Sequence, residues 1–119
     1  MKVLIVEDSL YIRTNLKKLF SEMKNINISG EAESSEEAIE LLKKEEHDII
    51  ILDVELKNST GFDVLKFVKN EKYSHKPIVL MLTNHSAVYR EKAIELKADY
   101  FFDKTNDLDN LLHVIKSLV

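Results

Sequence analysis

Residues 48–61, DIIILDVELKNSTG, decide the fold of this chain. Residues 49–52 form an apolar run of four without a polar break, and the run ends at Asp53. Such a run is typical of a strand buried on both faces, as in the centre of a parallel sheet. Asp53 then lies where the strand leaves the core. A carboxylate in that place either caps the following loop or is a reactive group, and the residues at the other strand ends distinguish the two.

The composition indicates one globular domain, 1–119. Hydrophobic residues make up 45% and charged residues 32%, which is ordinary for a globular protein. The absence of cysteine excludes disulfide frameworks, thiol catalysis and thiolate metal sites. The net charge of −4 gives no general attraction to nucleic acid or anionic lipid, and apolar runs of four or five residues are too short to span a membrane. We therefore expect a cytoplasmic protein without a direct nucleic-acid or membrane partner.

Strand and helix patterns alternate five times along the chain. Besides 49–52, the apolar runs 3–6, 78–82 and 100–102 predict strands, and 25–33 predicts a more polar strand at a sheet edge. Amphipathic patterns after each strand predict five helices, whose expected caps or first residues are, in chain order, Ser9, Ser34, Gly61, Ser86 and Leu108.

Three local features of these elements can be stated in more detail. The apolar stripe of the first helix extends from Ile12 to Met23. Ser34 and Glu37 have the spacing of a capping box at the start of the second helix. Residues 54–60 are expected to form a polar loop before the third helix.

The alternation predicts an α/β fold with a doubly wound parallel sheet, because right-handed crossovers place helices on both faces. Ligands of such sheets bind beyond the carboxyl ends of the strands. Four of the five predicted strands have chemically active groups at that end: Glu7, Asp8, Asp53, Thr83 and Lys104. If the polar second strand is the edge and the other four are neighbours, these groups converge on one rim.

This set of side chains suits phosphoryl chemistry. The three carboxylates repel one another, so at least one stays protonated unless a cation compensates them. An all-oxygen cluster suits a hard divalent cation, and Mg²⁺ fits best where few carboxylates leave room for water and a phosphate oxygen. Lys104 supplies a charge that pairs with phosphate, and Thr83 supplies a hydroxyl donor. Together they are the parts needed to transfer a phosphoryl group onto Asp53.

The chain resembles a two-component response-regulator receiver domain over essentially its whole length. The family's acidic pair, phosphoacceptor, glycine eight residues further on, switch hydroxyl, aromatic switch residue and lysine are matched in order by Glu7-Asp8, Asp53, Gly61, Thr83, Phe101 and Lys104. Each motif alone is weak, but their order and their places at strand ends make the signal specific. The resemblance implies a flavodoxin-like fold of five helices and a five-stranded sheet in the order 2-1-3-4-5.

The resemblance further implies a phospho-acceptor signalling switch. A histidine kinase or a histidine phosphotransfer protein would donate the phosphoryl group to Asp53 with Mg²⁺, or alternatively Mn²⁺, in the site. Asp8, Asp53 and the backbone carbonyl of Glu55 would bind the metal, with Glu7 acting partly through water. No enzyme activity is expected beyond the chain's own phosphorylation and slow dephosphorylation.

How the signal leaves the site is also implied by the resemblance. Thr83 and Lys104 would bind the phosphate, and Phe101 would turn inward as Thr83 moves. The surface formed by the fourth helix, fifth strand and fifth helix would then change its affinity for a downstream protein. The side chains of Glu55 and His85 would flank the water that hydrolyses the acyl phosphate. A monomer or a phosphorylation-linked dimer is expected.

Several residues depart from the family pattern without removing a reactive group, among them Lys57, which stands where the loop often has proline, and Phe101, which lacks the hydroxyl of a tyrosine. Thr105 stands where proline usually follows the lysine, and Asn84 where a small residue usually follows the switch hydroxyl. Lys97 stands where the fourth helix often ends in glycine, and a left-handed conformation there costs about 1 kcal/mol. These departures affect kinetics and partner choice.

Several alternatives stay open. Because the chain ends with the fifth helix, a stand-alone receiver is expected, but a fragment of a longer regulator has the same sequence. A pseudo-receiver would bind proteins without phosphorylation. A phosphatase or phosphotransferase with an aspartyl nucleophile is similar at residues 53–55 but needs more chain, and a flavin-binding module needs a phosphate-binding loop after the first strand.

Overall fold

Five parallel strands form one sheet in the order β2-β1-β3-β6-β7 in the computed structural model, which describes residues 1–73 and 75–119. The strands are β1 (Lys2–Val6), β2 (Asn27–Ala32), β3 (Ile49–Asp53), β6 (Ile78–Thr83) and β7 (Tyr100–Asp103). With β6 and β7 as the fourth and fifth long strands, this is the predicted order 2-1-3-4-5. The polar strand β2 lies at an edge, as predicted, and β3 lies in the centre.

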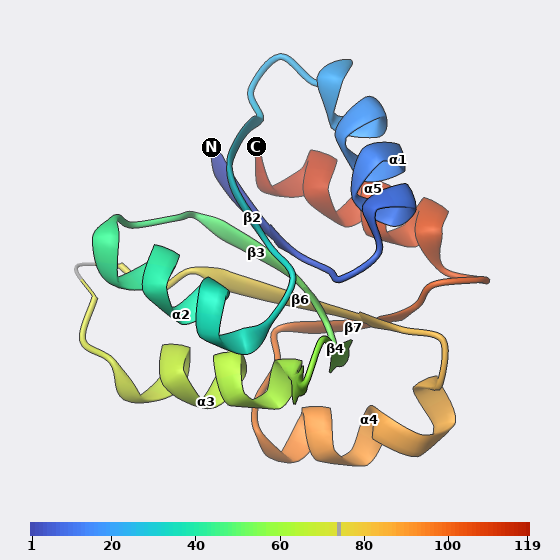
Figure 1. Ribbon diagram of the computed structural model, residues 1–119. Coiled ribbons are helices and arrows are strands. Elements are labelled where there is room, and N and C mark those ends of the chain that lie inside the picture. The colour runs from blue at the N-terminus through green and yellow to red at the C-terminus, as the bar shows by residue number, and fades with distance from the viewer. Residues whose placement is uncertain (74) are drawn as a thin grey trace.

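Helices cover both faces of the sheet (Figure 1). The helices are α1 (Leu10–Ser21), α2 (Ser35–Lys44), α3 (Gly61–Asn70), α4 (Ser86–Glu95) and α5 (Leu108–Leu118). α1 and α5 lie against one face, and α2, α3 and α4 lie against the other. The predicted doubly wound α/β architecture with five helices is therefore confirmed.

The apolar run of β3 supplies both halves of the core. Ile49 and Ile51 pack in the cluster beneath α1 and α5, whereas Ile50 and Leu52 pack in the cluster beneath α2, α3 and α4. All four are at most 1% exposed, so each contributes about 1.5–3 kcal/mol of hydrophobic burial to folding. The unbroken run is thus explained by the two apolar layers between which β3 lies.

Side-chain caps begin two of the helices as predicted. The Ser9 Oγ accepts a hydrogen bond from the Ile12 N–H at 3.3 Å, and the Ser34 Oγ accepts one from the Glu37 N–H at 3.2 Å. The return bond of the capping box differs from the prediction, because the Glu37 carboxylate accepts from the Glu33 N–H, one residue before the cap, at 3.3 Å.

Two predictions about helix ends are wrong. α1 ends at Ser21, so Met23 lies beyond the helix, although its side chain still packs against the core. Ser86 does not cap α4: His85 is the N-cap, and the Ser86 hydroxyl donates to the Asp103 carboxylate at 3.0 Å. A hydrogen bond to the charged carboxylate of Asp103 is stronger than the capping bond that the Ser86 hydroxyl could accept from a backbone N–H of the helix.

The predicted polar loop 54–60 is in fact a small hairpin of β4 (Glu55–Leu56) and β5 (Ser59–Thr60). Asn58, at its turn, has a φ of 55°, a conformation that asparagine adopts more readily than most residues. Leu56 is 8% exposed and packs in the core cluster beneath α2, α3 and α4. A single buried leucine in a polar stretch is too short a pattern to predict a strand.

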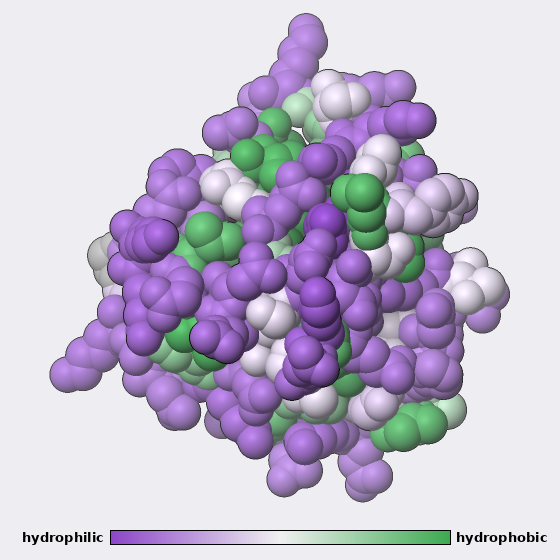
Figure 2. All heavy atoms as spheres, viewed as in Figure 1, coloured by the Kyte–Doolittle hydropathy of each residue, from purple (hydrophilic) through white to green (hydrophobic). Residues whose placement is uncertain are grey.

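The outer surface is largely hydrophilic where Figure 2 shows it, and its hydrophobic side chains stand in small, separate groups. The large hydrophobic residues that are most exposed lie on α1 and α4: Leu10, Tyr11, Val88 and Ile94. Among the described residues, every helix is too short or too polar to cross a membrane.

The packing at Gly61 predicts that Gly61→Ala is destabilising. A Cβ on Gly61 would lie 2.1 Å from the main-chain oxygen of Asp53, so α3 or the end of β3 must move. We expect a loss of about 1–3 kcal/mol in the free energy of unfolding, measured by urea denaturation. Gly30→Ala is the matched control: its Cβ would meet the Leu4 and Leu41 side chains at 3.2 and 3.4 Å, and an equal loss there would contradict the interpretation.

The end of α4 gives a prediction of the opposite sign. Lys97 has a φ of 65°, and the Lys97 and Ala98 N–H groups donate to the carbonyls of Ile94 and Ala93 at 3.0 Å each, which is the Schellman pattern. Because glycine pays no Cβ penalty there, Lys97→Gly should raise the free energy of unfolding by about 1 kcal/mol in urea denaturation. Lys97→Ala, which keeps the penalty, should change it little; equal effects of both variants would refute this cause.

Candidate functional site

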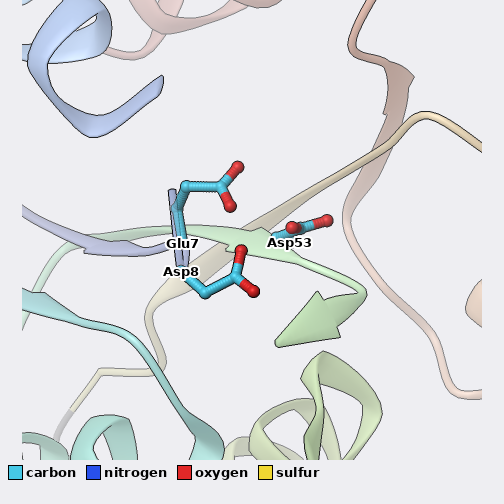
Figure 3. A group of neighbouring side chains, drawn as sticks. All are labelled: Glu7, Asp8 and Asp53. Atoms are coloured by element: carbon cyan, nitrogen blue, oxygen red, sulfur yellow. The ribbon is translucent and has the colours of Figure 1, made fainter. Parts of the chain in front are cut away.

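Three carboxylates meet where β1 and β3 end. Glu7 and Asp8 follow β1, Asp53 is the last residue of β3, and one carboxylate oxygen of each lies within 4.8 Å of the others. Figure 3 shows the three side chains extending past the strand ends in the same general direction. Glu7 and Asp53 are buried, at 2% and 4% exposure, whereas Asp8 is exposed. The sheet therefore holds two of the acids out of water and leaves the third accessible.

Lys104, which follows the edge strand β7, bonds to two of these acids. Its ammonium group donates to Glu7 Oε1 at 2.5 Å and to Asp53 Oδ2 at 2.9 Å. The lysine follows β7, and its backbone N–H donates to the carbonyl of Thr83 at 3.0 Å, which places it beside the end of β6. The predicted convergence of the strand ends is confirmed for the acids and for the lysine.

Burial governs the ionisation of this group. Burial raises the pKa of Asp53 and of Glu7, and the positive charge and hydrogen bonds of Lys104 offset only part of that effect. Partial burial and the adjacent Glu7 raise the pKa of Asp8. For Lys104, burial favours the neutral form, but the bonds and charges of Glu7 and Asp53 outweigh it, so its pKa is raised. The site therefore binds protons more readily than free carboxylates do, and another cation would compete with those protons.

The donor set fits a hard divalent cation. All three acidic side chains offer oxygen atoms, which Mg²⁺ prefers, and exposed Asp8 leaves one side open to water or to a phosphate oxygen. The Glu55 N–H donates to Asp53 Oδ1 at 3.4 Å, which brings the Glu55 backbone beside the acids. The residues present are thus suited to magnesium.

Thr83, Glu55 and His85 form a second group next to the acids. Thr83 is fully buried, and its Oγ1 accepts a hydrogen bond from the His85 N–H at 3.0 Å. The exposed ring of His85 has its Nδ1 2.5 Å from Glu55 Oε1. The structure thus brings Glu55 and His85 together and ties the Thr83 hydroxyl to the N-cap of α4.

Phe101 lies apart from this group. Its half-buried ring packs against the core cluster beneath α2, α3 and α4, and the guanidinium carbon of Arg90 lies 5.0 Å from the ring centroid. Phe101 thus contacts Arg90 of α4.

The loop after Lys104 shows how Thr105 replaces a proline. The Asp103 carboxylate accepts hydrogen bonds from the N–H groups of Thr105, at 2.8 Å, and Asn106, at 3.1 Å. These bonds lower the pKa of Asp103. Proline has no N–H, so the threonine gives the loop a fixing bond that the usual residue could not make.

Arg13 is a site neighbour that the sequence analysis missed. It is 7% exposed, and its guanidinium donates to the backbone carbonyl of Glu7 at 2.7 Å. The available signal was its place three residues before Leu16, on the buried face of α1. A charged residue on that face needs a buried acceptor, and the sequence does not identify which one.

Comparison with known proteins agrees with this geometry. Residues 3–116 match the response regulator receiver domain family. The chain is 32% identical over 116 residues to the sensory transduction protein LytT of Bacillus anthracis, covering 98% of this chain and 46% of LytT. It is 32% identical over 118 residues to the transcriptional regulatory protein YdfI of Bacillus subtilis, covering 99% of this chain and 54% of YdfI. The chain thus spans about half the length of these curated relatives.

Solved structures show the same fold. A CheY-like response regulator receiver domain from Methylobacillus flagellatus superposes with a TM-score of 0.83 at 18% identity, covering 100% of this chain and 98% of the other. The response regulatory domain of protein mrkE from Klebsiella pneumoniae gives a TM-score of 0.83 at 24% identity, covering 99% and 94%.

The raised pKa of Asp53 predicts that Asp53→Asn is stabilising at neutral pH. Folded Asp53 holds its proton more tightly than unfolded Asp53, so the native free energy of unfolding falls as pH rises from about 4 through the raised pKa. Without Mg²⁺ at pH 7, the variant should be more stable than the native protein, and this advantage should shrink toward pH 4. Urea denaturation at several pH values measures both effects.

Asp109→Asn, at an exposed position of α5, is the control for removing a carboxylate alone and should show no such trend. Addition of Mg²⁺ should stabilise the native protein more than Asp53→Asn. A native protein more stable than Asp53→Asn at pH 7 without Mg²⁺ would contradict the prediction.

Proposed function

Because the chain belongs to the response regulator receiver domain family, we propose that it is a phospho-acceptor switch of two-component signalling, phosphorylated on Asp53. The observation that carries the proposal is the position of Asp53: a buried carboxylate at a strand end, beside an acidic pair and in hydrogen-bond contact with Lys104. Asp53 also accepts from the Glu55 N–H, so its side chain is held from two sides.

The donor in this proposal is a phosphohistidine of a histidine kinase or histidine phosphotransfer protein. A carboxylate oxygen of Asp53 attacks the phosphorus in line, the P–O bond of the acyl phosphate forms, and the P–N bond breaks with its electron pair returning to the imidazole. A bound Mg²⁺, held by Asp8, Asp53 and the Glu55 carbonyl with Glu7 acting partly through water, would offset the negative charge of carboxylates and phosphoryl oxygens.

Lys104 is assigned the second charge-neutralising role. Its ammonium group has three hydrogens, and the structure shows it donating to Glu7 and Asp53. Once Asp53 is phosphorylated, a phosphoryl oxygen would take the place of the carboxylate oxygen as acceptor, while Glu7 continues to hold the lysine. Lys104 thereby stabilises the aspartate before transfer and the phosphoryl group after it.

The switch in this proposal begins at Thr83. Its hydroxyl turns toward a phosphoryl oxygen, which disturbs the bond that Thr83 Oγ1 accepts from the His85 N–H and so moves the start of α4. Phe101 follows as the contacts between β7 and α4 change, and the surface of α4, β7 and α5 alters its affinity for a downstream protein. Glu55 and His85, whose side chains pair beside the site, are assigned control of access for the hydrolytic water.

Intact-mass measurement after incubation with acetyl phosphate tests the proposal. The native protein should gain one phosphoryl group in the presence of Mg²⁺ and none in its absence, and Asp53→Ala should gain none. Asp48→Asn, which changes the acid at the opposite end of β3, should still be phosphorylated. Failure of the native protein to gain mass under any condition would overturn the proposal and favour a pseudo-receiver that binds proteins without phosphorylation.

A further inference from the structure

Arg13 links the acidic pair to two other segments of the fold. One terminal nitrogen of its guanidinium, Nη1, donates to the carbonyl oxygen of Glu7 at 2.7 Å. The Nε donates to Glu31 at 3.1 Å, and Nη2 donates to Glu33 at 3.2 Å. One planar group on α1 therefore holds the turn that carries Glu7 and Asp8 and also the end of β2.

This contact adds to the sheet pairing of the same turn. The Glu7 N–H donates to the carbonyl of Ala32 at 2.9 Å, so the sheet fixes the amide side of Glu7. Arg13 fixes its carbonyl side, which is the first half of the peptide bond leading to Asp8. The orientation of that peptide decides the direction in which the Asp8 side chain leaves the backbone. Without Arg13, the sheet would still hold the Glu7 N–H, but the carbonyl of the Glu7–Asp8 peptide would lose the hydrogen bond that Arg13 donates to it.

Packing alone does not account for an arginine at this position. Its neighbours on the buried face of α1 are Leu16 and Phe20, where an aliphatic residue would fill space without the cost of burying a charge. The three bonds use the planar fork that distinguishes arginine from lysine, since a single ammonium group cannot reach three separate acceptors in this arrangement. We therefore interpret the buried guanidinium of Arg13 as a group that orients its three acceptors.

We propose that Arg13 is a positioning residue for cation binding: it holds the Glu7–Asp8 peptide so that both carboxylates face the space shared with Asp53. The inference rests on the proposed function, because it concerns the metal that the proposed phosphorylation uses. Partners that orient metal ligands typically change metal affinity by 10- to 100-fold when they are removed. Arg13 would act in this way through a backbone carbonyl.

Electrostatics and positioning predict opposite results for Arg13→Met. Removal of a positive charge near the acids favours a divalent cation, so charge alone predicts tighter Mg²⁺ binding. Loss of the carbonyl bond frees the peptide to Asp8, so positioning predicts weaker binding. We expect isothermal titration calorimetry with MgCl₂ to show affinity about tenfold lower for Arg13→Met than for the native protein.

Two further variants separate charge from geometry. Lys17→Met removes a cation that pairs with Glu31 at 3.0 Å but lies on the outer side of the network, and it should bind Mg²⁺ at least as tightly as the native protein. Arg13→Lys keeps the charge and most of the packing but not the fork, so its affinity should also fall. Far-ultraviolet circular dichroism shows whether each variant is folded. If Arg13→Met does not fold, the milder Arg13→Lys variant still decides the test.

The phosphorylation kinetics provide a readout that a merely structural role would not change. With acetyl phosphate, the Mg²⁺ concentration for half-maximal rate should rise in both Arg13 variants by the factor found in calorimetry, while the rate at saturating Mg²⁺ stays near the native value. Native-like Mg²⁺ affinity in a folded Arg13→Lys or Arg13→Met protein would overturn the inference and leave the proposed function intact. If the native protein itself bound no Mg²⁺, the metal-dependent function would fall, and this inference with it.

Discussion

The buried carboxylates of Glu7 and Asp53 share the ammonium group of Lys104, and the arrangement of the carboxyl ends of the strands depends on that contact. Glu7 and Asp53 are 2% and 4% exposed, and Lys104 donates to both. Removing the cation of a buried ion pair typically costs about 3–5 kcal/mol, because the negative charge is left without compensation. Neutralising Asp53 differs from this, because Lys104 then still has Glu7 as its partner. The lysine thus fixes the ends of β1, β3 and β7 relative to one another. The single positive charge of Lys104 does not balance the three carboxylates, since Asp8 adds its own to those of Glu7 and Asp53.

The strand β3 belongs to both the core and the site. β3 is held by apolar layers on both faces, so the position of Asp53 is set by the packing of the four residues before it. Gly61 then brings the start of α3 against the main chain of Asp53, and its N–H donates to the carbonyl of Val54 at 2.7 Å. In the proposed function, a carboxylate with so little freedom would need no reorganisation before it meets a phosphoryl group, which is the advantage of building a site on rigid elements.

The sequence predicted the parts of the structure that depend on repeated patterns. The continuous run of β3, the five alternations and the polar groups at the strand ends were enough to place Glu7, Asp8, Asp53 and Lys104 on one rim. Features that rest on one side chain were not predictable. Leu56 is the one buried residue of the hairpin of β4 and β5, and Ser86 donates to Asp103 instead of capping the helix. The three acceptors of Arg13 come together only in the folded sheet.

The position of α4 in the proposed switch follows from how weakly the core holds it. Ala93 is its one fully buried residue among those described, whereas Val88 and Ile94 are 71% and 67% exposed. Its N-terminus is tied to the rim by the His85 N–H on Thr83 and by the Ser86 hydroxyl on Asp103. An element with little buried apolar area and polar ties at one end costs little to move when those ties change. A phosphoryl group that recruits the Thr83 hydroxyl would therefore act on the helix whose displacement the fold resists least, while β3 and α3, held by the core, keep the reactive aspartate in place.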